Sequence, residues 1–325
     1  MSEIIILTAG DVHISDVNPR SRKDNFKETI LGKLDQLRSA ASKLKADAVL
    51  LTGDIYNIKF PIKNSHDLNR ELIELFKKFK CPVYAIPGNH DLTADDLETL
   101  PEQPISVLFA SGFVKNLNHE IISKKGIKVS LVGIPFNKHF SIEALQIPPK
   151  EDNTAQICLM HIYAGPQAGK LFKERLYGYN ELSVLSPDAF VIGHYHVDQG
   201  IQWLEKKCFI NLGSISRGTL SDENLEHKPK FGFIRISEDG SITAESIPLT
   251  IKPVEEVFDL KKREEEKKED QDIQKYVEHL VAEATAIETK KVTVEDHMKI
   301  LNIEQEVYNE VLELIREAST IQKKV

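Results

Sequence analysis

The stretch VIGHYHVDQG, residues 191–200, carries two histidines directly after a short hydrophobic run. Val191 and Ile192 indicate the end of a buried strand, and His194 and His196 follow it one residue apart. A His-x-His pair at a strand end is by itself most often a surface feature. Its meaning therefore depends on whether other strands of the chain also end in side chains that can bind a common ligand.

Four other strand-like runs of the sequence end in the same kind of side chain. The motifs that follow them are GDVH, TGD, PGNHD and LMH. In chain order they provide Asp11 and His13, then Asp54, then Asn89, His90 and Asp91, and finally His161. In open α/β sheets the carboxyl ends of the strands form the ligand-binding edge, so we expect these groups to meet there.

The periodicity of the sequence predicts an α/β fold with two sheets. Strand-like runs at 3–8, 48–54 and 81–90 alternate with helical patterns at 24–47 and 68–80, which is typical of parallel βαβ units. After residue 120 the runs at 127–136, 155–163, 188–196, 207–213 and 231–237 follow one another with few helices between them. They suggest a second sheet packed on the first, with a hairpin turn at EDGSIT, residues 238–243.

The composition indicates a globular chain without a disulfide framework. It has 325 residues, of which 41% are hydrophobic and 28% charged, and a formal net charge of −8. An acidic chain is a poor candidate for tight autonomous binding to nucleic acid, unless bound metals or a partner supply positive charge. The three separated cysteines, Cys81, Cys158 and Cys208, fit a reducing cytoplasm, and the apolar run at 4–7 is too short for a signal peptide or a membrane span.

The C-terminal fifth of the chain has a different composition. LKKREEEKKEDQD, residues 260–272, is a mixed-charge run without an apolar stripe, and helical spacing of Ile303, Val307, Val311 and Ile315 follows it. We therefore divide the chain into a core, residues 1–258, and a charged linker with a small helical module, residues 259–325. Such helices can bind a partner, or they can pack on the core of their own chain.

Aspartate, histidine and asparagine side chains together suit a divalent ion such as manganese, iron or zinc. Seven of them can hold two ions with one carboxylate in common, and such a pair of ions can support the hydrolysis of a phosphate ester. A further histidine that binds no metal can donate a proton to the leaving oxygen. Each of these residues alone is more often structural, and only their ordered combination points to a metal centre.

That ordered combination, Asp-x-His, Gly-Asp, Gly-Asn-His-Asp, a single histidine and Gly-His-x-His, resembles the calcineurin-like metallophosphoesterase superfamily over about residues 1–250. The resemblance implies a four-layer α/β/β/α sandwich. It also implies that Asp54 bridges two metals, that His90 is the catalytic acid or stabilises the transition state, and that Asp91 orients His90. One metal would be held by Asp11, His13, Asp54 and His196, and the other by Asp54, Asn89, His161 and His194.

Within the superfamily, three stretches are similar to SbcD-type DNA nucleases: GDIYN at 53–57, ICLMHIYAG at 157–165 and the region from FINLGSISRG at 209–218 onward. The Gly-Asp motif is not followed by the arginine of protein phosphatases. The similarity implies a manganese-dependent nuclease subunit of an SbcCD-type repair and recombination complex. It would be a homodimer whose C-terminal helices bind an SbcC-type, SMC-like ATPase, in the cytoplasm of a bacterium or a phage-infected cell.

The same similarity suggests candidate contacts to DNA and marks one departure from the nuclease pattern. Ser214 and Arg217, after the strand at 207–213, are candidates for contact with DNA, although a simple turn explains them equally well. Asn57 stands where these nucleases have an aspartate or a histidine, which puts exonuclease action in doubt but leaves metal binding unaffected.

Two other functions share the same motifs. A phosphoesterase that acts on small phosphomonoesters or cyclic nucleotides would use every one of these ligands, but it would not need a tethered helical module. A catalytically inactive scaffold of the same fold would be expected to have lost some ligands, and this sequence has lost none.

Overall fold

The computed structural model describes residues 2–19, 22–151, 154–171, 174–218 and 221–261. Residues up to Asp259 form one compact unit. The helical module predicted at 259–325 lies, from residue 262 onward, outside the described residues. Among the described helices, none is both long enough and apolar enough to cross a membrane.

The first sheet contains the parallel strands that the N-terminal βαβ pattern predicts. The strand order is β15-β14-β1-β2-β3-β4, with parallel pairing from β1 through β4. The strands are β1 (Glu3–Ala9), β2 (Ala48–Leu51), β3 (Val83–Ala85), β4 (Lys115–Asn116), β14 (Lys230–Ser237) and β15 (Ile242–Pro248).

The last hairpin of the described region belongs to this first sheet. Its position after residue 120 had suggested the second sheet, and that prediction is wrong. β14 pairs antiparallel with β1 from Glu3 opposite Ser237 to Thr8 opposite Gly232, and β15 pairs antiparallel with β14. The predicted turn between β14 and β15 is confirmed. The composition of a strand shows that it is buried but does not show which of two sheets it joins.

The second sheet has the order β12-β13-β11-β7-β6-β5. Its inner strands β6, β7, β11 and β13 are parallel, and β5 and β12 pair antiparallel at its two edges. The strands are β5 (His119–Lys124), β6 (Ile127–Ile134), β7 (Thr154–Ile162), β11 (Ala189–His194), β12 (Gly200–Leu204) and β13 (Lys207–Asn211).

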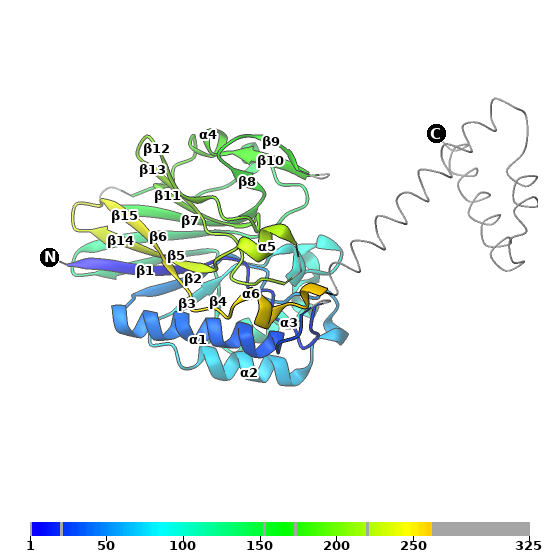
Figure 1. Ribbon diagram of the computed structural model, residues 1–325. Coiled ribbons are helices and arrows are strands. Elements are labelled where there is room, and N and C mark those ends of the chain that lie inside the picture. The colour runs from blue at the N-terminus through cyan, green and yellow to red at the C-terminus, as the bar shows by residue number, and fades with distance from the viewer. Residues whose placement is uncertain (1, 20–21, 152–153, 172–173, 219–220, 262–325) are drawn as a thin grey trace, which may run out of the picture. The chain divides into compact units, whose positions relative to one another are not determined.

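The two sheets lie face to face, as Figure 1 shows. Apolar side chains fill the space between them. Ile4, Ile6 and Leu50 of the first sheet lie in one buried cluster with Leu131 and Ile157 of the second. Alternate residues of a strand point to opposite faces, so Leu7 and Val49 face the other way and pack with the helices. The mixed α/β sandwich that the sequence predicts is therefore confirmed.

Helices cover the outer face of the first sheet. They are α1 (Phe26–Leu44), α2 (His66–Phe76) and α3 (Pro104–Ala110). The side chain of Asn25 caps α1 by accepting from the Glu28 amide, and Phe26, Ile30 and Leu34 lie buried along one side of the helix, as predicted. The remaining short helices near this face are α5 (Asp222–Glu226), α6 (Val254–Val257) and the 3-10 turns η1 (Pro61–Lys63), η2 (Asn89–Asp91), η3 (Thr93–Asp95) and η4 (Leu97–Glu102).

The outer layer on the second sheet is thin. It contains η5 (Ile142–Ala144), the single turn α4 (Tyr179–Leu182) and a small sheet of β8 (Ala164–Gly165), β10 (Glu174–Gly178) and β9 (Gly169–Leu171). Aromatic packing anchors this layer, since the ring of Tyr179 stacks on that of Phe209 with centroids 4.5 Å apart. The fourth layer of the predicted sandwich is thus present with only short elements.

Candidate metal centre

The carboxyl ends of five strands meet at one edge of the sandwich. Asp11 and His13 follow β1, Asp54 follows β2, and Asn89 begins η2 just after β3. From the second sheet, β7 and β11 provide the remaining three side chains, those of His161, His194 and His196. The structure therefore brings all seven predicted ligands together, because strands that run in the same direction end at the same edge.

Two groups of metal-competent side chains form there, and Asp54 belongs to both. One group contains Asp11, His13, Asp54 and His196, the other Asp54, His161 and His194, each with its ligand atoms within 4.8 Å of one another. The amide oxygen of Asn89 adds to the second group, since its Oδ1 lies 3.2 Å from His161 Nε2. This is the division into two metal sites that the sequence predicts.

The atoms inside this cluster fit divalent cations better than they fit one another. Asp54 Oδ2 is buried, has no hydrogen-bond partner, and lies 3.5 Å from both His13 Nε2 and His161 Nε2. The Nε2 atoms of His13 and His196 face each other at 2.9 Å. A buried carboxylate oxygen without a partner is costly, and a cation bound between these groups would satisfy it.

The backbone at these strand ends adopts a strained conformation. Three of the ligands have positive φ angles, 51° at His13, 46° at Asp54 and 83° at His194. Residues other than glycine adopt this region rarely, and such strain persists where the surrounding structure enforces it, often at functional sites. Here the Asp54 carbonyl oxygen accepts hydrogen bonds from the amides of Val12 and His13, which ties the ends of β1 and β2 together.

Further hydrogen bonds fix the orientation of the ligand side chains. Asp11 accepts from the Thr52 hydroxyl at 2.8 Å and from the His194 amide at 2.9 Å. His161 Nδ1 lies 2.7 Å from the Thr52 carbonyl oxygen, so this nitrogen carries the proton and Nε2 faces Asp54. Metal-binding histidines characteristically donate their other N–H in this way.

Buried charges shift the pKa values of the ligands in the ion-free chain. Burial lowers the pKa of an imidazole, but for His161 the Asp54 and Asp11 carboxylates outweigh it and raise the pKa to about 9. Burial likewise raises the pKa of a carboxyl group, but His161 and His13 hold the pKa of Asp54 well below its usual range. The positive charge of His161 thus takes the place of the cation for which the carboxylates are arranged.

His90 lies beside the first group, and its ring is oriented by a backbone carbonyl. His90 Nδ1 is 2.8 Å from the Asn57 carbonyl oxygen, and its ring centroid is 4.8 Å from that of His13. The carbonyl can only accept, so Nδ1 carries a proton and Nε2 is the nitrogen that can exchange one with a substrate. Asn57 is therefore close to the predicted catalytic residue through its backbone.

The predicted role of Asp91 is not supported. Its buried carboxylate accepts from the amides of Ile55, Tyr56 and Gly88 at 3.0 to 3.1 Å, and no hydrogen bond joins it to the His90 ring among the described residues. Burial, together with the charge of Asp54, raises the pKa of Asp91 to about 7. Asp91 instead holds the loop after β2 against the loop after β3, which places Asp54 and His90 next to each other.

Ser214 and Arg217, the predicted contacts to DNA, both have buried side chains that bond within the chain. The Ser214 hydroxyl donates to the Asp11 carbonyl oxygen at 2.7 Å, and Arg217 Nη2 donates to the Lys252 carbonyl oxygen at 2.8 Å. The sequence pattern singled out the loop after β13, and the structure shows that this loop supports Asp11 from behind. Neither side chain lines the pocket beside His161 and His194.

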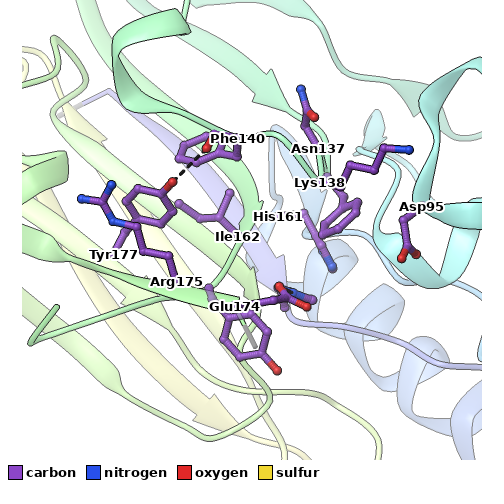
Figure 2. A pocket seen from close by; sticks show the side chains of 12 residues that line it. Asp95, Asn137, Lys138, Phe140, His161, Ile162, Glu174, Arg175 and Tyr177 are labelled. Atoms are coloured by element: carbon purple, nitrogen blue, oxygen red, sulfur yellow. Dashed lines mark hydrogen bonds and ion pairs between the residues drawn. The ribbon is translucent and has the colours of Figure 1, made fainter. Parts of the chain in front are cut away.

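A pocket of about 310 Å³ opens beside the second group, and Figure 2 shows the side chains around it. His161 and His194 form part of its wall, together with Phe136, Tyr163 and Glu174. Lys138 and Arg175 also line it, together with the carboxylates of Asp95 and Glu174, so the pocket combines aromatic surface with charges of both signs. Such a pocket suits a polar ligand with an aromatic or sugar ring.

Glu174 is a site residue that no sequence pattern had selected. It lies on β10 in the thin outer layer, and its Oε2 is 3.0 Å from His194 Nε2. The other ring nitrogen, Nδ1, makes no hydrogen bond to the described residues. KERLYG, residues 173–178, matches no catalytic motif, and only the folding of β10 over the end of β11 brings the carboxylate to His194.

Comparisons with known proteins agree with this geometry. Residues 4–198 match the calcineurin-like phosphoesterase family. The chain is 27% identical over 267 residues to the DNA double-strand break repair protein Mre11 of Saccharolobus solfataricus, an alignment that covers 74% of this chain and 64% of that protein. The chain thus spans about 64% of the length of this curated relative.

Two solved structures are also similar, at lower identity. TT1561 of Thermus thermophilus is 13% identical, with a TM-score of 0.44, and the match covers 76% of this chain and 99% of that one. The NAD nucleotidase NadN of Haemophilus influenzae is 14% identical, with a TM-score of 0.46, and the match covers 77% of this chain and 56% of that one.

We predict that metal binding releases a proton from His161. A ligand imidazole must be neutral, and the pKa of about 9 means that His161 is protonated at neutral pH before an ion binds. Manganese affinity should therefore fall about tenfold for each pH unit below about 9 and gain nothing from this group above it. Calorimetry at about pH 7.5 in buffers of different ionisation enthalpy measures the release, and a net release of no protons would contradict the prediction.

We predict that Glu174→Gln weakens metal binding without unfolding the chain. Glu174 is partly exposed and holds His194 through one hydrogen bond, and loss of such a supporting partner typically costs about 10- to 100-fold in affinity or activity. Manganese titration of this variant should be compared with Glu143→Gln, which removes an exposed carboxylate from the same layer. Equal affinities of the two variants would show that Glu174 does not support the centre.

Proposed function

The chain belongs to the calcineurin-like phosphoesterase family and is a metal-dependent phosphoesterase. We propose that the phosphate ester it hydrolyses is DNA. In this proposal the chain is the nuclease subunit of an SbcCD-type repair complex and hydrolyses backbone phosphodiester bonds. The observation that carries the proposal is the sequence match with a DNA double-strand break repair protein over 74% of the chain.

The metal centre supplies the chemistry that such hydrolysis needs. Two divalent ions, when bound, neutralise charge on the phosphate and make a bound water more acidic. Asp11, His13, Asp54 and His196 would hold one ion, and Asp54, Asn89, His161 and His194 the other. We propose manganese for both, since oxygen and imidazole ligands in this mixture suit that ion.

His90 is the group that we propose to assist the leaving oxygen. Its ring is half-buried, contacts the first metal group through His13, and has its Nδ1 committed to the Asn57 carbonyl. Proton transfer would therefore go through Nε2. A positioned histidine of this kind contributes about 100- to 10,000-fold to a rate.

The acidic character of the chain bears on how DNA would be held. With a net charge of −8, the chain lacks the excess of lysine and arginine from which autonomous DNA-binding proteins derive their affinity. We propose that an SbcC-type, SMC-like ATPase supplies much of the DNA contact, that the C-terminal helices at 259–325 bind this ATPase, and that the chain works as a homodimer in the cytoplasm. The three cysteines are free thiols, which fits a reducing compartment.

A second candidate function is hydrolysis of small phosphomonoesters or cyclic nucleotides. The pocket of about 310 Å³ beside His161 and His194 favours it, because its size and its mixture of aromatic rings and polar groups suit a mononucleotide. The same pocket can accept the terminal nucleotide of a DNA strand, so the pocket alone does not choose between the two functions.

The nuclease proposal predicts that the chain degrades linear DNA with manganese and that His90→Gln lowers this activity about 100- to 10,000-fold while both ions stay bound. Double-stranded and single-stranded DNA should be digested beside a chromogenic phosphomonoester and phosphodiester. His139→Gln is a matched control, because His139 is exposed and lies outside the centre.

The alternative outcomes are distinct. Turnover of small esters without any DNA cleavage, even with the ATPase present, would favour the small-molecule function. Loss of bound metal in His90→Gln would show that His90 is a ligand and not the acid.

The partner proposal predicts that deleting residues 260–325 spares hydrolysis of a small phosphodiester and abolishes co-purification with the ATPase. The described residues up to Asp259 form a compact unit that contains every candidate ligand, so the truncated chain should remain folded. Capture of the ATPase by the truncated chain would place the binding surface on the core.

A further inference from the structure

A second cavity, of about 260 Å³, lies between helix α1 and the segment that follows β15. Thr29, Lys33 and Gln36 of α1 line it, together with Arg217 and residues 250–252. None of the candidate metal ligands reaches this cavity, so it is separate from the site described above.

Buried positive charge at this cavity exceeds the buried negative charge. Arg22, Lys33 and Arg217 are 7%, 3% and 3% exposed, and Asp24 is the carboxylate that lies among them. Asp24 is already bound to Arg22 through two hydrogen bonds of 2.9 and 2.7 Å. In the part of the chain that the structure describes, no carboxylate forms an ion pair with Lys33 or Arg217, which is costly for buried cations.

The donors of these two cations are also incompletely used. Lys33 has three N–H donors, and its Nζ donates to one described acceptor, the Ile215 carbonyl oxygen, at 2.6 Å. Arg217 donates through Nη2 to Lys252, while its Nε is buried without a partner. Burial, with Arg217 and Arg22 nearby, lowers the pKa of Lys33 to about 7, the direction expected for an ammonium group that lacks a counter-ion.

We propose that this cavity binds a phosphate-like oxyanion between Lys33 and Arg217. A planar guanidinium and an ammonium group together match the oxygens of a tetrahedral anion, and such charge-assisted hydrogen bonds are the strong ones. Glu28, the carboxylate among the described lining residues, is solvent-exposed, so water and salt screen its charge.

The backbone beside the cavity leaves room for the ligand. Gly32 lies in the interior of α1, where glycine is usually unfavourable, and it lines the cavity. A Cβ atom at this position would meet nothing within 4 Å.

The oxyanion site adjoins the segment that supports the metal centre. Lys33 holds the Ile215 carbonyl, and the Ile215 amide and the Ser214 hydroxyl both donate to the Asp11 carbonyl oxygen, at 3.1 and 2.7 Å. An anion bound to Lys33 and Arg217 would therefore lie directly behind the loop that positions Asp11. The proposal concerns this chain's own cations and stands whether the substrate of the metal centre is DNA or a small ester.

Equilibrium dialysis of the full-length chain against radiolabelled orthophosphate tests the proposal, with EDTA present so that no metal ion can hold phosphate. We expect saturable binding that is at least about tenfold weaker in Lys33→Met and in Arg217→Gln. Arg38→Gln, which changes a cation of α1 paired with Asp35, should bind as the unchanged chain does. Absence of saturable binding, or equal binding in both variants and the unchanged chain, would overturn the proposal.

A second pair of variants keeps the test decisive if either of these substitutions unfolds the chain. Gly32→Glu places a carboxylate in the wall of the cavity, so it should repel an anion and weaken phosphate binding. Gly32→Gln, which is of equal size but uncharged, should weaken phosphate binding less than Gly32→Glu does. Equal phosphate affinities of the two variants would overturn the proposal.

Competition identifies the source of the anion. Displacement of orthophosphate by a short single-stranded oligonucleotide would show that the site accepts a phosphate of a DNA strand. Displacement by phosphomonoesters but not by the oligonucleotide would show that it accepts a free anion.

Discussion

The burial of the Asp54 carboxylate between the ends of two sheets is the constraint on which the site depends. Asp54 is 0% exposed and follows Gly53, and both residues have positive φ angles. One carboxylate oxygen accepts from the His90 amide at 2.7 Å, and the other lies 3.5 Å from the imidazole nitrogens of His13 and His161. A buried carboxylate is tolerated only where positive charge compensates it, and here that charge comes from histidine or from bound cations.

The same constraint explains two glycines of the motifs. At Gly88 a Cβ atom would lie 2.2 Å from Asp54 Oδ1, and at Gly193 it would lie 2.5 Å from Asp11 Oδ1. A side chain at Gly88 would displace Asp54, which both metal groups share. A side chain at Gly193 would displace Asp11, which belongs to the first group. The two sheets can approach closely at this edge because β11 and the loop after β3 present bare backbone to the ligands.

The sequence predicted the parts of the site that depend on strand direction, and missed those that depend on loop paths. Asp11, Asp54, His161 and His194 could be placed together because parallel strands carry them to one edge. The partners of Asp91 and Arg217, by contrast, lie on segments distant in the sequence, so the sequence pattern did not reveal them.

Glu174 was missed for the same reason, and so was the assignment of the last hairpin to the first sheet. Hydrophobic periodicity shows that a strand is buried, but it does not show with which strand it pairs, because the partner lies far away in the sequence. The three-stranded layer that carries Glu174 to His194 has short, partly polar strands, whose periodicity is too weak to place them.

If the Asp54 carboxylate is shared by two ions, its removal should empty both metal sites, and the metal content of an Asp54→Asn chain measures this. After saturation with manganese and dialysis, elemental analysis should find two ions per unchanged chain. Asp54→Asn should lose both, because each group loses its shared ligand. Asp95→Asn, which removes a carboxylate that lines the neighbouring pocket but belongs to neither metal group, should keep two. Retention of both ions by Asp54→Asn, or of only one by the unchanged chain, would contradict a centre built around Asp54.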